Sequence, residues 1–134
     1  MGRKPRGEFQ GATYHVIKRG NNRDYIFQTR QDKEDFLECL ETANEEEVFN
    51  LLGYVIMDNH YHLIIETKEV PLNKIMQKIN NTYSKNYNKR HNRRDHVFGG
   101  RYKSILVNDD KYLLSLLRYI HANPVRAKIL HNMA

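Results

Sequence analysis

The stretch "VFNLLGYVIMDNHYHLIIET", residues 48–67, decides the fold. Its two halves, 48–57 and 61–67, are rich in β-branched and aromatic residues, and an Asp-Asn pair between them is typical of a turn. We therefore predict a hairpin at the centre of a sheet. The same stretch carries His60 and His62 at positions where isoleucine or valine would pack better, and this raises the question of function.

Segments on both sides extend the hairpin into a longer pattern of elements. Residues 12–19 alternate polar and apolar side chains and run into a Gly-Asn-Asn turn at 20–22, which predicts a first strand. Residues 97–107 return to strand chemistry, with two glycines at 99–100 that indicate a bulge or a close backbone approach. The sequence therefore predicts four strands.

Three helices are predicted between and after these strands. A capping box at Thr29 precedes apolar residues at helical spacing, and we expect this helix to continue through the glutamates at 45–47. After Pro71, apolar positions three or four apart predict a long amphipathic helix that runs toward residue 90, with Tyr83 and Tyr87 in the core. Asn108 or Asp109 caps a last, strongly apolar helix, which Pro124 stops or kinks.

The resulting order, βαββαβ followed by a C-terminal helix, predicts an α+β fold. We expect a ferredoxin-like or RRM-like antiparallel sheet with two helices on one face and the last helix on the other. The 134 residues suit a single domain, 1–134, and are enough to bury a core. Cys39 is the only cysteine, and no apolar run is long enough to span a membrane, so we expect a cytoplasmic protein.

The charge is unevenly distributed along the chain. The net charge is +6 and the pI is about 9.4, which favours a polyanionic partner. Residues 85–103 hold seven cations against one acid, an excess of six that equals the excess of the whole chain. Aromatic residues are interleaved with these cations, a composition suited to phosphate contacts and base stacking. We expect DNA contacts from Arg93, Arg94, Arg101 and Lys103.

His60 and His62 are the first candidates for chemistry. Residues two apart in a strand point to the same side and rise together by roughly 6.6 Å, so two imidazoles can meet one cation. In the last helix, Tyr119 and Asn123 lie one turn apart on the same face, whereas His121 points elsewhere. Each feature alone has a plainer interpretation: an exposed hairpin, a packed aromatic residue, a helix cap.

The combination of motifs is more specific than any one of them. In this order, "MDNHYHLII", "FGGRYKSILV" and "LLRYIHANPVRA" resemble the single-tyrosine HUH transposases of the IS200-like insertion-sequence type, and in particular their REP-associated branch. The resemblance extends over most of the chain, from "GATYHVIKRGNNR" onward. It implies a single-stranded DNA endonuclease and strand transferase that acts on DNA with hairpin structure.

The resemblance also implies roles for individual residues. His60 and His62 hold a divalent ion, Mg²⁺ or Mn²⁺, with Asn123 as the third protein ligand. Tyr119 attacks the scissile phosphate, giving a 5′-phosphotyrosine and a free 3′-hydroxyl. Related insertion-sequence enzymes commonly carry glutamine where this chain has Asn123, so His121 is the alternative third ligand. By resemblance to the family's first-strand turn, the predicted DNA contacts also include Lys18, Arg19 and Arg23.

Other functions are left open by the sequence. An RRM-like sheet with a basic rim can bind single-stranded nucleic acid without chemistry. A metal-dependent phosphodiesterase that uses water as its nucleophile would keep His60 and His62 but would tolerate Tyr119→Phe. The sequence also leaves open whether the protein is a monomer or a homodimer in which the tyrosine helix of one subunit completes the other's site.

Overall fold

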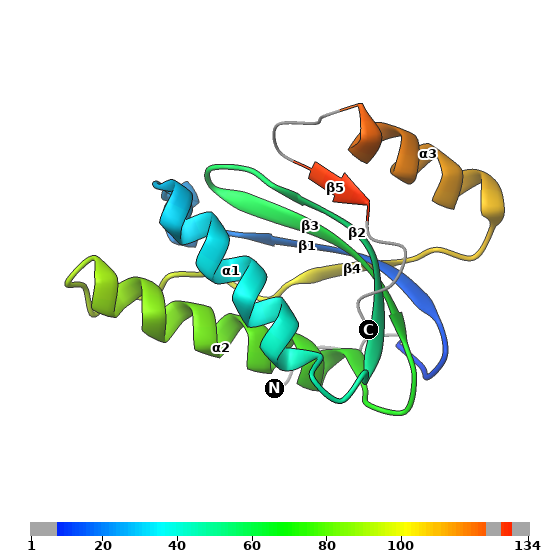
Figure 1. Cartoon of the computed structure of the whole chain (residues 1–134), viewed down its shortest axis with the longest axis horizontal. Helices are drawn as coiled ribbons and strands as arrows, with labels where there is room; N and C mark the ends of the chain where they lie inside the picture. The colour runs from blue at the N-terminus through cyan, green and yellow to red at the C-terminus, as the bar shows by residue number, and fades with distance from the viewer. Residues whose placement is uncertain (1–7, 123–126, 130–134) are drawn as a thin grey trace.

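A computed structural model describes residues 8–122 and 127–129. Its centre is an antiparallel sheet of five strands in the order β4-β1-β3-β2-β5. The predicted hairpin pairs β2 with β3 in the middle of this sheet (Figure 1). The elements are β1 (Thr13–Arg19), the 3₁₀ turn η1 (Asn21–Arg23), α1 (Arg30–Ala43), β2 (Phe49–Ile56), β3 (His60–Thr67), α2 (Leu72–Arg90), β4 (Lys103–Leu106), α3 (Asp110–His121) and β5 (Ala127–Ile129).

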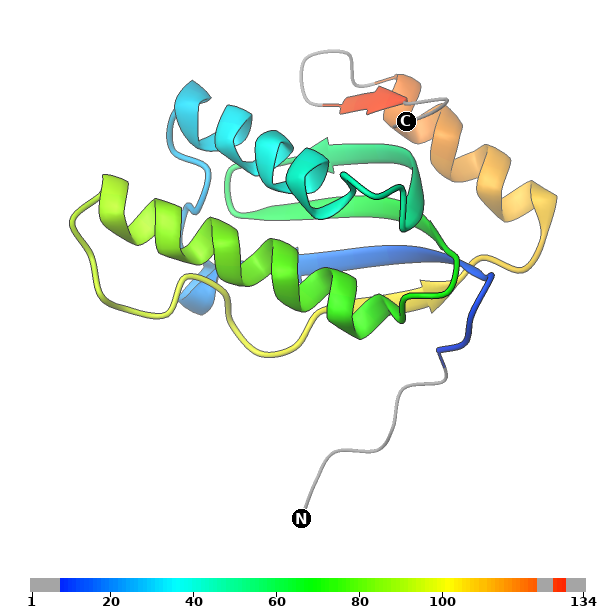
Figure 2. The same ribbon diagram turned by 60° about the horizontal axis from the view of Figure 1, so that its bottom comes forward.

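The helices cover the two faces of the sheet unequally. α1 and α2 lie side by side on one face, and α3 lies on the other, as Figures 1 and 2 show. The face under α1 and α2 holds the large core, whereas the face under α3 holds a small second cluster built around Val55, Ile64 and Ile120. The predicted α+β arrangement is therefore confirmed, with α3 as the only described helix on its face.

α1 begins as predicted but ends earlier. The Thr29 hydroxyl accepts a hydrogen bond from the Asp32 amide, and the Asp32 carboxylate accepts one from the Thr29 amide, which completes the capping box. The helix stops at Ala43, so the expectation that it includes the glutamates at 45–47 is wrong. The reason is Asn44, whose side-chain oxygen accepts a hydrogen bond from the first amide of β2 at 3.0 Å and turns the chain into the sheet.

α2 runs from Leu72 to Arg90 and keeps its two tyrosines in the core, as predicted. Both hydroxyls bond to the segment that follows η1. Tyr83 donates to the carbonyl of Ile26, and Tyr87 donates to the carbonyl of Tyr25 at 3.0 Å. These two bonds therefore tie this segment, which adjoins the end of β1, to α2.

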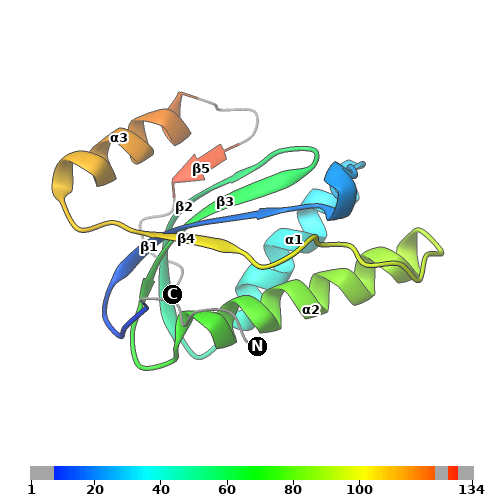
Figure 3. The same ribbon diagram turned by 180° about the vertical axis from the view of Figure 1, so that it is seen from behind.

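The last strands differ from the prediction. β4 is limited to Lys103–Leu106, and the preceding Phe98 contributes only an isolated bridge to Gly20. A side chain at Gly99 would place its Cβ 3.1 Å from the Asn21 backbone, so the expected close approach is confirmed. Figure 3 shows β4 along the outer edge of the sheet. β5, which pairs with β2, was not predicted.

No helix within residues 8–122 and 127–129 is both long and apolar enough to cross a membrane.

Candidate active site on the sheet face under α3

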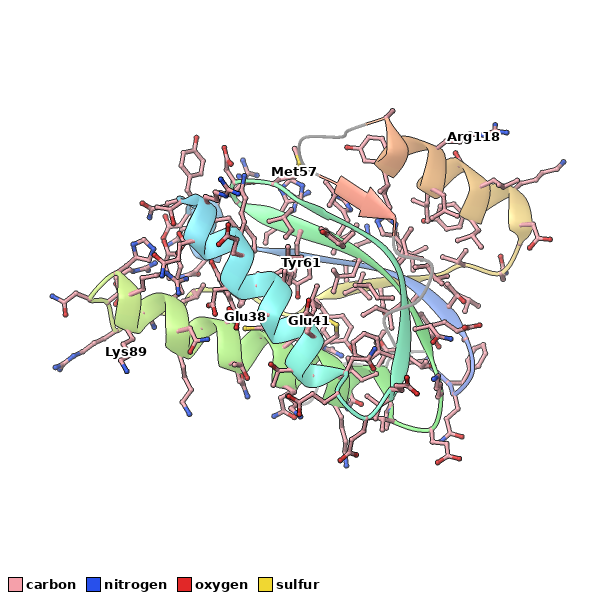
Figure 4. The ribbon with its side chains drawn as sticks, viewed as in Figure 1. Glu38, Glu41, Met57, Tyr61, Lys89 and Arg118 are labelled. Atoms are coloured by element: carbon pink, nitrogen blue, oxygen red, sulfur yellow. The ribbon has the colours of Figure 1, made fainter. Side chains whose placement is uncertain are left out.

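The register of β1 and β3 determines which side chains face α3. Arg19 pairs with His60, Ile17 with His62, and His15 with Ile64. Directly paired residues of antiparallel strands project to the same side, so these side chains share one face. The intervening residue Tyr61 points the other way, into the large core between the sheet and α1, as Figure 4 shows. There its hydroxyl donates to the side-chain oxygen of Asn80 at 2.6 Å.

Three histidines meet on this face. The rings of His60 and His62 have centroids 5.1 Å apart, and the ring of His15 stacks on His62 at the same separation. His15 Nε2 lies 2.9 Å from His62 Nδ1, and His15 Nδ1 lies 3.2 Å from the hydroxyl of Tyr112 on α3. His60 Nδ1 lies 2.8 Å from the side-chain oxygen of Asn59. Each Nδ1 of the predicted pair therefore has a partner.

The surroundings favour the neutral form of all three rings. Burial, together with the nearby His15, His60 and Arg19, lowers the pKa of His62 to about 4. Burial and Lys103 lower the pKa of His15, and burial and Arg19 lower that of His60. A neutral imidazole keeps a lone pair, which a metal ligand needs.

α3 places Tyr119 over the same face of the sheet. The helix begins at its N-cap Asp109, whose carboxylate accepts a hydrogen bond from the Tyr112 amide at 2.8 Å. It docks through Ile120, which packs with Val55, the strand partner of His62. Tyr119 is 53% exposed and lies two turns after Tyr112, so the two tyrosines share one stripe of the helix.

The predicted metal ligands are only partly described. His60 and His62 keep their Nε2 atoms without a hydrogen bond to any described residue, and both rings lie on one rigid strand. Asn123 and the side chain of His121 lie outside the described residues. Within that described part, no three His, Cys, Asp or Glu side chains are grouped to hold a metal ion. The two imidazoles fit a divalent ion that takes its other ligands elsewhere.

Two of the predicted DNA contacts, Arg19 and Lys103, lie beside the histidines. Arg19 is exposed opposite His60, and Lys103 is exposed on β4, paired with Ile17 on the same face. Lys18 does not belong with them: it is 7% exposed on the helix side, where its ammonium donates to the carbonyl of Gly100. The predicted DNA contact of Lys18 is therefore not favoured, because strand alternation turns it inward.

The other predicted contacts are spread along the molecule. Arg23 is exposed in η1, and Arg93 lies over the Tyr87 ring, with its guanidinium 3.9 Å from the Asp24 carboxylate. Arg94 lines a polar pocket of about 390 Å³ between α2 and the loop at 91–98. Arg101 lines a different pocket, beside Glu8. None of these four cations is among the charges that lower the pKa of His15, His60 or His62.

The motif search missed three residues of the site: His15, Asn59 and Tyr112. His15 lies in the alternating segment 12–19, which already placed it on the face opposite the core residues Tyr14 and Val16. That alternation was the available signal. The contact of His15 with His62 depends on the pairing of β1 with β3, which the sequence of either strand alone does not predict.

The chain has an α+β fold in which a histidine pair lies on the sheet face that a tyrosine-bearing helix covers. Residues 8–123 match the family described as "Transposase IS200 like". The chain belongs to this family. A comparison with curated protein sequences gives no match.

Solved structures share the fold at low sequence identity. A REP-associated tyrosine transposase bound to a REP hairpin aligns with a TM-score of 0.73 and 15% identity, covering 93% of this chain and 73% of that one. A candidate transposase from Deinococcus radiodurans R1 aligns with a TM-score of 0.60 and 12% identity, covering 90% of this chain and 97% of that one. The tRNA(His) guanylyltransferase of Saccharomyces cerevisiae aligns with a TM-score of 0.54 and 8% identity, covering 86% of this chain and 61% of that one. The last match shows that this fold also supports other chemistry.

Proposed function

We propose that this chain is a transposase-type endonuclease and strand transferase for single-stranded DNA with hairpin structure, and that Tyr119 is its nucleophile. Family membership supports the transposase class. The observation that carries the finer proposal is the placement of His60 and His62 on the sheet face that α3 covers, with Nε2 atoms that form no hydrogen bond to any residue the structure describes. The related transposase bound to a REP hairpin supports the choice of DNA substrate.

In the proposed reaction the Tyr119 oxygen forms a bond to the scissile phosphorus, and the bond from phosphorus to the 3′-oxygen breaks. The phenol loses its proton and the leaving 3′-oxygen gains one, so the products are a 5′-phosphotyrosine and a free 3′-hydroxyl. The phosphodiester energy is kept in the protein–DNA bond, and the reverse attack rejoins the strand without ATP. The exposure of Tyr119 suits this role, because a DNA strand must reach its hydroxyl.

His60 and His62 are the proposed ligands of Mg²⁺ or Mn²⁺, with Asn123 or His121 as the third. When bound, the cation draws charge from a non-bridging phosphate oxygen and so stabilises the more negative transition state. Arg19 adds a positive charge beside His60, where the phosphate would lie. Lys103 does the same near His15.

The test is formation of a covalent adduct on end-labelled DNA. Hairpins with randomised single-stranded flanks are incubated with the protein and Mg²⁺ or Mn²⁺ and resolved under denaturing conditions. The label should travel with the protein when it is at the 3′ end and should be released when it is at the 5′ end. Tyr119→Phe should abolish the adduct, and His60→Ala with His62→Ala should do the same while the fold stays intact.

Tyr25→Phe is the matched control, because this ring is 64% exposed and lies on a different segment. This variant keeps Tyr119 and should form the adduct normally. Metal-dependent cleavage that survives Tyr119→Phe would instead indicate water as the nucleophile. Binding without cleavage by the unaltered protein would indicate a nucleic-acid-binding module.

Mixing a His60→Ala protein with a Tyr119→Phe protein tests whether subunits share a site. Each variant alone should be inactive. Recovery of the adduct on mixing shows that the tyrosine helix of one subunit serves the histidines of another, and its absence assigns the whole site to one chain.

A further inference from the structure

A chain of ring contacts links the histidine pair to the helix that carries Tyr119. It runs from His62 Nδ1 to His15 Nε2 over 2.9 Å, and from His15 Nδ1 to the Tyr112 hydroxyl over 3.2 Å. Its members come from β3, β1 and α3, so it joins three elements that are distant in sequence. The proposed reaction uses neither His15 nor Tyr112.

We infer that His15 is a positioning residue, held by Tyr112, which fixes the ring of His62 so that its Nε2 faces the proposed cation. This inference rests on the proposed metal site. Ligating histidines commonly donate their second ring N–H to a fixed acceptor, and this contact sets both tautomer and orientation.

Each predicted ligand has a neighbour that can accept a hydrogen bond from its Nδ1. Asn59 offers an oxygen to His60 Nδ1, and an amide oxygen only accepts, so His60 carries its proton on Nδ1. For His62 the same tautomer requires that His15 Nε2 accepts. His15 then carries its own proton on Nδ1 and donates it to Tyr112. Every contact in the chain is satisfied, and both Nε2 lone pairs remain for the cation.

The opposite arrangement would put the His62 proton on Nε2. In that case His15 Nε2 would donate to His62, and Tyr112 would donate to His15. This arrangement satisfies the same contacts but removes the His62 lone pair from the metal side. The role proposed for His15 therefore specifies which ring nitrogen of His62 carries the proton. The ring contacts are the same in both arrangements, so packing alone does not decide between the two tautomers.

The contact between His15 and Tyr112 couples the sheet to α3. Tyr112 lies two turns before Tyr119, roughly 10 Å along the helix axis. The helix that presents the nucleophile therefore also holds the partner of a metal ligand. When α3 leaves the sheet, His15 loses its acceptor and His62 loses its fixed orientation.

The first measurement uses the full-length metal-free protein with ¹⁵N-labelled histidine. Long-range ¹H–¹⁵N correlations assign the tautomer of each ring. We expect His60 and His62 to be protonated on Nδ1, and Tyr112→Phe to raise the Nε2-protonated fraction of His62. Finding His62 protonated on Nε2 in the unaltered protein would overturn the inference, whether or not the protein cleaves DNA.

The second measurement is Mn²⁺ affinity by electron paramagnetic resonance. His15→Phe keeps an aromatic ring but has no acceptor, and should weaken Mn²⁺ binding by roughly 10-fold or more. His15→Gln supplies an oxygen acceptor and should recover part of the affinity. His96→Phe, at an exposed histidine away from the site, is the matched control and should leave affinity unchanged.

The outcomes separate this inference from the proposed function. Equal Mn²⁺ affinity of folded His15→Phe and unaltered protein refutes the positioning role and leaves the proposed nuclease intact. Absence of Mn²⁺ binding in the unaltered protein counts against the proposed metal site, and the tautomers of the metal-free protein then still decide the role of His15.

Discussion

Replacing Ile120 with alanine should release α3 from the sheet while the rest of the fold stays intact. Ile120 is 2% exposed and packs with Val55 and Ile64 in the small cluster under α3. The substitution removes three buried carbons at about 0.8 kcal/mol each, and a residual cavity raises the total to roughly 2–4 kcal/mol. This loss falls on the second cluster, because the large core under α1 and α2 does not include Ile120.

Amide hydrogen exchange measures this effect element by element. A loss of roughly 2–4 kcal/mol corresponds to an increase of about 30-fold to 1,000-fold in exchange through local opening, at about 1.4 kcal/mol for each tenfold. We expect that increase in α3 and little change in β1 and β3. Leu114→Ala, on the exposed side of the same helix, should change stability by less than about 0.5 kcal/mol. An equal loss of protection in α3 and β3 would refute independent docking of the helix.

Three further predictions concern the fold around the site. Thr29→Ala removes the α1 cap and should lower the urea-derived free energy of unfolding by about 1 kcal/mol, whereas Thr42→Ala, exposed on the same helix, should change it little. Gly20→Ala places a Cβ 2.4 Å from the Asp24 carbonyl oxygen, so this turn must shift, and the melting temperature should fall by several degrees for a cost of roughly 1–3 kcal/mol. The pKa of His62 is lowered from 6.5 to about 4 by folding, so its stability contribution is complete above pH 6.5 and is lost as the pH falls toward 4. Between pH 7.5 and pH 5 the free energy of unfolding should fall by about 2 kcal/mol at most, and by about 1 kcal/mol after solvent screening. In urea unfolding, metal-free His62→Gln should therefore show a weaker pH dependence than the unaltered protein.

Local patterns in the sequence predicted the elements well because each pattern reports a local physical preference. The hairpin at 48–67 and the capping box at Thr29 follow from turn chemistry and from backbone donors that need partners. Strand alternation also placed His60 and His62 on one face. The same rule, applied to Lys18, turns its side chain toward the helices together with Tyr14 and Val16, and the motif-based prediction overlooked this.

Features that depend on tertiary contacts could not be predicted in the same way. α1 ends at Ala43, where the Asn44 side chain accepts a hydrogen bond from the Phe49 amide, a contact between the helix end and β2 that the helical spacing of apolar residues does not reveal. The partnership of His15 with His62 needs the register of β1 against β3, and that with Tyr112 needs the docking of α3. Neither of these two contacts can be inferred from one element alone. The histidine pair was therefore predicted, whereas His15 and Tyr112 were not.

The unequal division of the core fits the proposed chemistry. The large core packs against β1 and β3, and this keeps the strand positions of His60 and His62 fixed relative to each other, as a preorganised site requires. α3, by contrast, is held mainly by a small cluster around Ile120, so it should move at a lower energetic cost than the elements of the large core. In the proposed reaction, a single strand of DNA must enter between the proposed nucleophile on α3 and the proposed metal ligands on the sheet. A rigid sheet under a weakly docked helix permits that entry, and the contact from Tyr112 to His15 then links the return of the helix to the orientation of His62.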